Sequence, residues 1–247
     1  MKLTVINSNS DGNCYLLEND KEALIIEAGV RFDRVKQALK FKLKKVVGCL
    51  LTHEHGDHAK FVDHVLNASI NVYASRGTFE AIGREAHHRS IKMVNGEQRI
   101  AGGFKIKAFD VKHDVAEPFG FIINHEECGN VLFLTDSYYC EYTFPGLNNI
   151  IIEANYCETI LQRRLESGTN PKFLRDRVIQ SHMSLQTCKD MLAANDLSKV
   201  NNILLIHLSN SNSDERRFKK EVEEVTGKTV HVANAGYVID PFNKQPF

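Results

Sequence analysis

The residues that could do chemistry in this chain are concentrated in the segment His-Glu-His-Gly-Asp-His at positions 53–58. His53 and His55 lie two residues apart, so an extended backbone directs both imidazoles to the same side. The glycine that follows permits a tight turn, which can bring Asp57 and His58 into the same volume. Imidazole nitrogens together with a carboxylate suit a divalent ion such as zinc. A polar loop that holds histidines by chance is the alternative, and this dense spacing disfavours it.

Other candidate residues stand, like this segment, directly after apolar runs. Runs that alternate or are rich in β-branched residues predict strands. The metal-ligand segment follows Val46–Leu51, Glu27 ends the run Ala23–Glu27, His113 follows Phe104–Val111, Asp136 follows Val131–Leu134, and His207 follows Asn202–Ile206. Functional side chains gathered at strand ends are typical of a layered scaffold with catalytic loops.

The remaining periodicity predicts further elements on both sides of this pattern. We expect strands at Leu3–Asn7, Cys14–Glu18, Asn71–Ala74, Asn149–Ile152, Thr229–Val232 and Tyr237–Ile239. We expect helices at Phe32–Phe41, Ala59–Ala68, Thr78–Ala86, Thr159–Leu165, Phe173–Ile179, Leu185–Leu192 and Asp214–Val225. Each half of the chain gives strands and then helices, and no linker separates the halves. The sequence therefore predicts one α/β domain over residues 1–247.

Composition excludes several classes of protein. The 31 basic and 31 acidic residues give no formal net charge, which argues against a protein that coats nucleic acid by bulk charge but leaves a local basic groove open. The six cysteines form no Cys-x-x-Cys pair, so we expect a reduced, cytoplasmic protein without disulfides. No apolar run reaches membrane-span length and no signal peptide begins the chain, which disfavours a secreted enzyme and a membrane partner.

A strand followed by His-Glu-His-Gly-Asp-His resembles the metallo-β-lactamase superfamily of metal-dependent hydrolases. The resemblance implies a four-layer αβ/βα sandwich and a centre of two divalent ions, zinc by default with manganese or iron as alternatives. It implies a dinuclear-metal-activated hydroxide as the nucleophile. It assigns His53, His55 and His113 to the first ion, Asp57, His58 and His207 to the second, and Asp136 to both.

The superfamily also carries an acidic residue and a glycine, spaced as Glu27 and Gly29 are here. The usual acid is aspartate, and it orients a ligand histidine. Glutamate is one methylene longer, so the sequence does not determine which residue Glu27 contacts. A solvated carboxylate at a strand end is the alternative.

Several short motifs resemble the YycJ/WalJ-like branch, whose members are regarded as 5′→3′ DNA exonucleases related to RNase Z. They are Ser10-Asp11-Gly12-Asn13-Cys14-Tyr15, His113-Asp114 with Pro118-Phe119-Gly120-Phe121, Glu153-Ala154-Asn155, Ser181-His182-Met183-Ser184 and His207-Leu208-Ser209. RNase Z-like enzymes carry a non-ligand histidine near the scissile phosphate, and His182 matches that place. The resemblance therefore implies that His182, with Asp57, acts in catalysis and that His182 protonates the leaving oxygen. A helix-capping histidine is the alternative for His182.

Basic side chains before His182 could contact flanking phosphates, although interspersed acids make a solvated helix face equally reasonable. They are Arg163, Arg164, Lys172, Arg175 and Arg177. We also expect a solvated surface for the lysines between positions 36 and 45, and surface rather than ligand roles for His64, His87, His88, His125 and His231.

The metal motif does not choose the substrate. The first hypothesis is a phosphodiesterase or nuclease acting on DNA. The second is a cyclic nucleotide phosphodiesterase, which the neutral net charge suits. The third is a lactone, lactam or thioester hydrolase, in which His182 has no obvious role. A binding module on a decayed hydrolase scaffold is the non-enzymatic alternative, and the complete ligand set disfavours it. The oligomeric state stays open, with a homodimer among the options.

Overall fold

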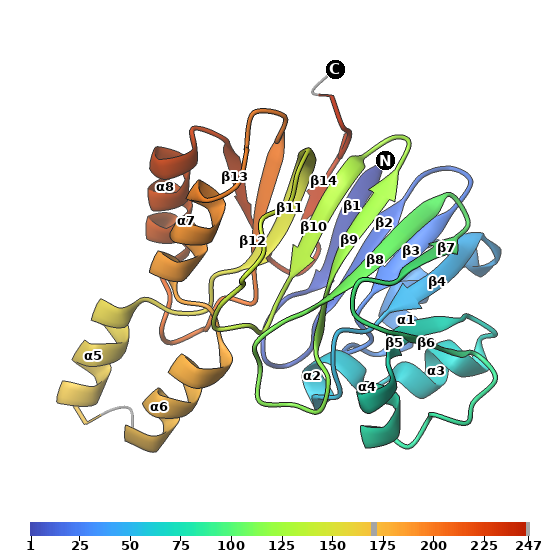
Figure 1. Ribbon diagram of the computed structural model, residues 1–247, viewed down its shortest axis with the longest axis horizontal. Coiled ribbons are helices and arrows are strands. Elements are labelled where there is room, and N and C mark those ends of the chain that lie inside the picture. The colour runs from blue at the N-terminus through green and yellow to red at the C-terminus, as the bar shows by residue number, and fades with distance from the viewer. Residues whose placement is uncertain (169–171, 246–247) are drawn as a thin grey trace.

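A computed structural model describes residues 1–168 and 172–245, and these residues form two mixed β-sheets that pack face to face with helices outside them (Figure 1). The first sheet has the order β14-β1-β2-β3-β4-β5-β6, and the second has the order β13-β12-β11-β10-β9-β8-β7. The first contains β1 Lys2–Asn7, β2 Cys14–Glu18, β3 Ala23–Ile26, β4 Val46–Leu50, β5 Val72–Ser75, β6 Ser90–Met93 and β14 Val238–Ile239. The second contains β7 Gln98–Ala101, β8 Phe104–Asp110, β9 Phe119–His125, β10 Gly129–Leu134, β11 Leu147–Glu153, β12 Asn202–Ile206 and β13 Thr229–Val232.

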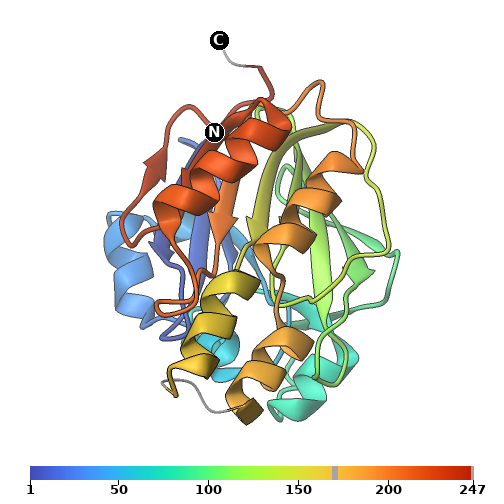
Figure 2. The same cartoon turned by 90° about the vertical axis from the view of Figure 1, so that its left-hand side faces the viewer.

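The helices cover the outer faces of the sheets (Figures 1 and 2). Those from the first half are α1 Phe32–Ala38, α2 Gly56–Ala59, α3 Val62–Asn67 and α4 Arg76–Ala81, with a 3₁₀ turn, η1, at Leu43–Lys45. Those from the second half are α5 Glu158–Glu166, α6 Lys172–Ser181, α7 Leu185–Ala193 and α8 Glu215–Thr226. Helices α7 and α8 lie against the second sheet, whereas α5 and α6 project beyond the lower ends of the strands in Figure 1.

Three apolar cores define the layers. One lies between the sheets and includes Leu24, Tyr73 and Phe121. A second joins the first sheet to its helices, and a third joins the second sheet to α7 and α8. Because strand side chains alternate between faces, each sheet can fill two cores at once. The α/β four-layer sandwich expected from the sequence is confirmed.

The largest difference from the expected elements is the break in the helix predicted at Ala59–Ala68. The chain forms α2 and α3 instead, which are separated around Phe61. The Phe61 N–H bonds the Ala28 carbonyl at 2.9 Å, so it leaves the helical ladder to fasten the metal-ligand segment to the end of β3. Tertiary contacts have overridden helical periodicity here.

Three strands were not expected from the sequence, namely β6, β7 and β9. β7 is a short edge strand whose first three residues are exposed, so it lacks an apolar signal. β9 contains Gly120, where an added Cβ would lie 2.3 Å from the Phe109 ring. This glycine permits a close strand contact, although glycine weakens the strand pattern in the sequence.

Among the helices of the described residues, none is long and apolar enough to cross a membrane. The surface positions expected for His64 and His88 hold, whereas His125 is buried. The prediction for His125 was wrong because a neighbour offsets the cost of burial: its Nε2 lies 3.0 Å from Oε1 of Glu22.

Candidate metal and active site

Three imidazoles converge in the first part of the site. His53 and His55 come from the loop after β4, and His113 comes from the loop after β8. The His53 ring centroid lies 4.9 Å from that of His55 and 4.8 Å from that of His113. Nδ1 of His55 and Nε2 of His113 are 3.2 Å apart. The structure therefore brings together residues distant in sequence, as the strand-end pattern predicted.

A second group lies beside it and contains carboxylates. Nε2 of His58 lies 3.0 Å from Oδ2 of Asp136 and 3.3 Å from Oδ2 of Asp57. Nε2 of His207 lies 3.2 Å from the same Asp57 oxygen. All seven ligand positions expected from the sequence thus fall into neighbouring groups of side chains that could hold metal ions.

Backbone geometry at the strand ends turns side chains into this cluster. Glu27, Asp136 and His207 have φ values of 68°, 47° and 53°, which are uncommon for residues other than glycine. Such conformations cost free energy and persist where surrounding structure enforces them. Nearby, a Cβ added to Gly29 would lie 1.7 Å from the Asp57 carbonyl oxygen. The acid-x-Gly spacing therefore allows the end of β3 to touch the metal-ligand loop.

Glu27 is buried and faces His58. Its Oε1 lies 3.5 Å from His58 Nδ1, and its Oε2 lies 3.5 Å from the Thr52 backbone nitrogen. Glu27 therefore approaches a candidate ligand histidine, as the resemblance implies for the acid at this position. The alternative of a solvated carboxylate is wrong because the side chain has no exposed surface.

Sequence reasoning assigned no role in the site to Glu153, although the residue stands in the Glu153-Ala154-Asn155 motif. This fully buried carboxylate ends β11 and holds both C-terminal histidines. Its Oε1 lies 2.8 Å from Nδ1 of His182 and 3.0 Å from Nδ1 of His207. Its Oε2 accepts hydrogen bonds from the backbone nitrogens of Met183 at 3.0 Å and Ser137 at 3.3 Å. The available signal was an acid after a strand of the same type as the one before Asp136.

His182 lies beside the carboxylates, with Nδ1 also 3.0 Å from Oδ1 of Asp136. Burial alone would lower the pKa of His182, but the charges and hydrogen bonds of Glu153 and Asp136 outweigh it and raise this pKa to about 11. The same contest raises the pKa of His207 to about 9, with Asp136 and Asp57 as the leading partners. In the metal-free chain, the neighbouring carboxylates therefore favour the protonated form of both imidazoles.

The first group behaves differently. Burial, followed by the nearby charge of His58, holds the pKa of His53 well below its usual range. Burial also lowers the pKa of His113. Both imidazoles are consequently neutral, as a metal ligand must be. Nε2 of His53 is buried and makes no hydrogen bond within the described part of the chain. A buried nitrogen without a hydrogen bond, placed among three imidazoles, fits a metal ion. The ion would bind the lone pair of a polar atom that is otherwise costly to bury.

The basic residues proposed to contact phosphate lie on α5 and α6. Arg163 and Arg177 are exposed, while Arg175 is half-buried with Nη1 3.1 Å from Oδ1 of Asp176. The Lys172 side chain lies outside the described part. These helices project on the side where the strands of the site end (Figure 1). Their role in phosphate binding stays a prediction.

A family model for the metallo-beta-lactamase superfamily matches residues 9–136. The chain belongs to this superfamily of metal-dependent hydrolases. It is 25% identical over 239 residues to exodeoxyribonuclease YycJ of Bacillus anthracis, covering 91% of this chain and 89% of the relative. It is 26% identical over 228 residues to exodeoxyribonuclease WalJ of Streptococcus pneumoniae serotype 2, covering 86% and 83%. The predicted resemblance to both relatives is thereby confirmed.

The crystal structure of the metallo-beta-lactamase fold protein YhfI from Bacillus subtilis has the same fold. Its TM-score is 0.74 at 19% identity, and the match covers 97% of this chain and 99% of that chain. At this identity the likeness concerns the arrangement of the sheets and helices alone.

Proposed function

We propose that the chain is a single-domain phosphodiesterase of the nuclease type, acting on DNA in the manner of a 5′→3′ exonuclease. The observation that carries the proposal is the position of His182, an imidazole held by Glu153 at 2.8 Å next to the candidate metal ligands. A proton donor at this place suits a substrate with a poor leaving group. The names of the two exodeoxyribonuclease relatives support the same substrate class.

In this proposal, His53, His55 and His113 would hold one divalent ion, Asp57, His58 and His207 would hold a second, and Asp136 would be available to both. Five imidazoles and two carboxylates are too many ligands for one tetrahedral ion. The chemistry that such ions supply when bound is Lewis acidity, which activates water and neutralises charge on a phosphoryl oxygen. Glu27 orients His58 from behind, through the contact between its Oε1 and Nδ1.

His182 handles the proton in this reaction. Its Nδ1 hydrogen bond to Glu153 fixes the ring and leaves Nε2 with the proton that can be donated. A phosphodiester releases an alkoxide, and a proton delivered from Nε2 to that oxygen lowers the cost of its departure. Glu153 acts as a positioning residue, since it holds His182 rather than touching the substrate.

A cyclic nucleotide phosphodiesterase is the second candidate, because a chain without net charge needs no extended polyanion as substrate. The same metal ligands and the same His182 would serve a small phosphodiester. A lactone, lactam or thioester hydrolase gains less from the proton donor, since those leaving groups depart more readily or remain attached.

Metal content tests the ligand assignment. Protein purified without chelator should contain close to two ions per chain by elemental analysis. His207→Ala should remove the second ion selectively, because that ion would lose one of the three ligands assigned to it alone. His64→Ala is the matched control, since His64 is exposed and outside the site. A stable, active protein with one ion would contradict the assignment.

A substrate panel tests the reaction itself. We expect degradation of 5′-phosphorylated DNA, with a rate that falls as salt rises because each phosphate contact releases counterions. The panel includes a cyclic mononucleotide, a cyclic dinucleotide, a chromogenic β-lactam and a glutathione thioester. Turnover of a cyclic nucleotide without action on DNA would favour the second candidate. Activity confined to the lactam or thioester would refute the phosphodiesterase proposal.

A further inference from the structure

A hollow of about 470 Å³ lies at the end of the first sheet opposite the candidate metal site. β1 starts beside the hollow at Lys2 and ends near the site, where Ser8 accepts a hydrogen bond from the His207 backbone nitrogen at 2.9 Å. β2 runs the other way, from beside Asn13 at the site to Glu18 in the hollow. The hollow and the candidate metal site therefore lie at opposite ends of β1 and β2.

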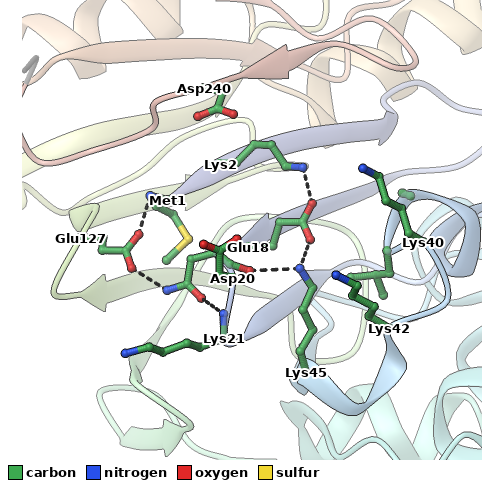
Figure 3. Close-up of a pocket in the computed structure, with 13 residues that line it drawn as sticks. Met1, Lys2, Glu18, Asp20, Lys21, Lys40, Lys42, Lys45, Glu127 and Asp240 are labelled. Carbon is green, nitrogen blue, oxygen red and sulfur yellow. Dashed lines mark hydrogen bonds and ion pairs between the residues drawn. The ribbon is translucent and has the colours of Figure 1, made fainter.

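The floor of the hollow is an ion triad around one buried carboxylate, that of Glu18 (Figure 3). Glu18 is only 4% exposed, yet its carboxylate contacts the ammonium groups of two lysines. Its Oε1 lies 2.6 Å from Nζ of Lys2, and its Oε2 pairs with Nζ of Lys45. Burial alone would raise the Glu18 pKa, but the two lysines outweigh it and lower this pKa. One carboxylate with two ammonium groups leaves the floor positively charged.

Three further lysines, Lys21, Lys40 and Lys42, line the hollow without an ion pair to any described residue. Lys40 and Lys42 form a lysine wall that reaches into the hollow from the loop after α1 (Figure 3). The loop is well held: the Lys40 N–H bonds the Gln37 carbonyl at 2.9 Å, and the Lys42 N–H bonds the Leu39 carbonyl at 3.0 Å. Lys40 and Phe41 have φ values of 49° and 60°, a costly backbone that presents both ammonium groups on one side.

The acidic lining leaves this lysine wall available. Glu127 is occupied by the Met1 amine at 2.5 Å and by Nδ2 of Asn19 at 2.6 Å. Asp20, which lies beside Glu18 in Figure 3, and Asp240 also line the hollow, but neither forms an ion pair with Lys40 or Lys42. Few apolar side chains line the hollow, so it is poorly suited to an uncharged or apolar ligand. Its size lies in the usual range for small-ligand pockets, ~300–1,000 Å³.

We propose that this hollow, lined by Lys2, Lys40, Lys42 and Lys45, is a binding site for a phosphate-bearing anion. Lysine ammonium groups are compact charges that bind phosphate oxygens by charge-assisted hydrogen bonds. The ion triad holds Lys2 and Lys45 in place before the ligand arrives, which reduces the entropy lost on binding. The phosphate could belong to a free oligophosphate or to a nucleic acid backbone, and the two sources are separable by experiment.

The test compares two double variants that lose the same charge. K40Q/K42Q removes two ammonium groups from the hollow, whereas K36Q/K44Q removes two from the same stretch of chain but not from the lining. Pyrophosphate and a dodecathymidylate with a hydrolysis-resistant phosphorothioate backbone are titrated by calorimetry into metal-loaded protein carrying any tag at its C-terminus. Any binding at the metal centre is common to all proteins, so the difference between the variants reports on the hollow.

We expect K40Q/K42Q to bind pyrophosphate about tenfold or more weakly than wild type, and K36Q/K44Q to stay within about twofold. A parallel loss with dodecathymidylate would identify a nucleic acid backbone as the ligand, and its absence would identify a free oligophosphate. Turnover of a small chromogenic phosphodiester should be unchanged in both variants, because the hollow lies away from the candidate active site. A loss of pyrophosphate binding would then concern the hollow and not the proposed reaction. Equal losses in the two variants, or no loss in either, would overturn the proposal.

Discussion

His182→Ala is expected to slow DNA hydrolysis by roughly 10²–10⁴-fold while the fold and both ions are retained. The variant removes a proton donor whose Nδ1 lies 2.8 Å from Glu153, but it leaves the seven proposed ligands intact. Single-turnover rates, elemental analysis and circular dichroism on the same preparation measure the three quantities. Arg216→Ala is a useful control, because Arg216 is exposed on α8, lies outside the proposed phosphate contacts and removes a charge without touching Glu153.

The leaving group separates proton donation from a structural role. A 4-nitrophenyl phosphodiester releases a stable anion that needs little protonation, so His182→Ala should cost far less with this substrate than with DNA. Equal losses on both substrates would argue against proton donation. His182 also belongs to a group with Asp136, Glu153 and His207 that could itself hold an ion. Loss of one ion in the variant would therefore reassign His182 as a ligand.

The layers of the fold were predictable because strand and helix periodicities are local properties of the sequence. Runs such as Val131–Leu134 and Ile203–Ile206 are apolar and buried on both faces, and each lies inside an observed strand. The convergence of the residues after these runs was predictable for the same reason: parallel strands end at the same edge, so their next residues meet. The assignment of these residues to metal ions came from the resemblance to the superfamily and stays a prediction.

What the sequence could not supply depends on contacts between distant segments. The break at Phe61 arises from a hydrogen bond to Ala28, 33 positions earlier in the chain. The burial of His125 depends on Glu22, and the function of Glu153 depends on two histidines that lie 29 and 54 positions later. A lone acid after a strand looks the same whether it is solvated or buried. Only the packed structure distinguishes these environments.

Glu153→Gln is expected to reduce the rate by about 10²-fold or more and to move the alkaline limb of the pH–rate profile to lower pH. Glu153 is the leading cause that raises the pKa of His182. Removal of its charge lowers that pKa, so the imidazolium needed for proton donation is lost at a lower pH. Glutamine also cannot accept hydrogen bonds from both His182 and His207 with the strength of a carboxylate.

The charge-conserving variant decides whether this effect is electrostatic or only structural. Glu153→Asp keeps the negative charge, so its alkaline limb should stay near that of the wild type even if the shorter side chain slows the reaction. Glu158→Gln, which neutralises an exposed carboxylate on α5, should leave both rate and profile unchanged. Because Glu153 acts through His182, the rate of H182A/E153Q should lie close to that of H182A rather than show the product of two losses. An additive double variant with two ions still bound, or an unmoved alkaline limb in Glu153→Gln, would show that His182 does not depend on Glu153 for its proton.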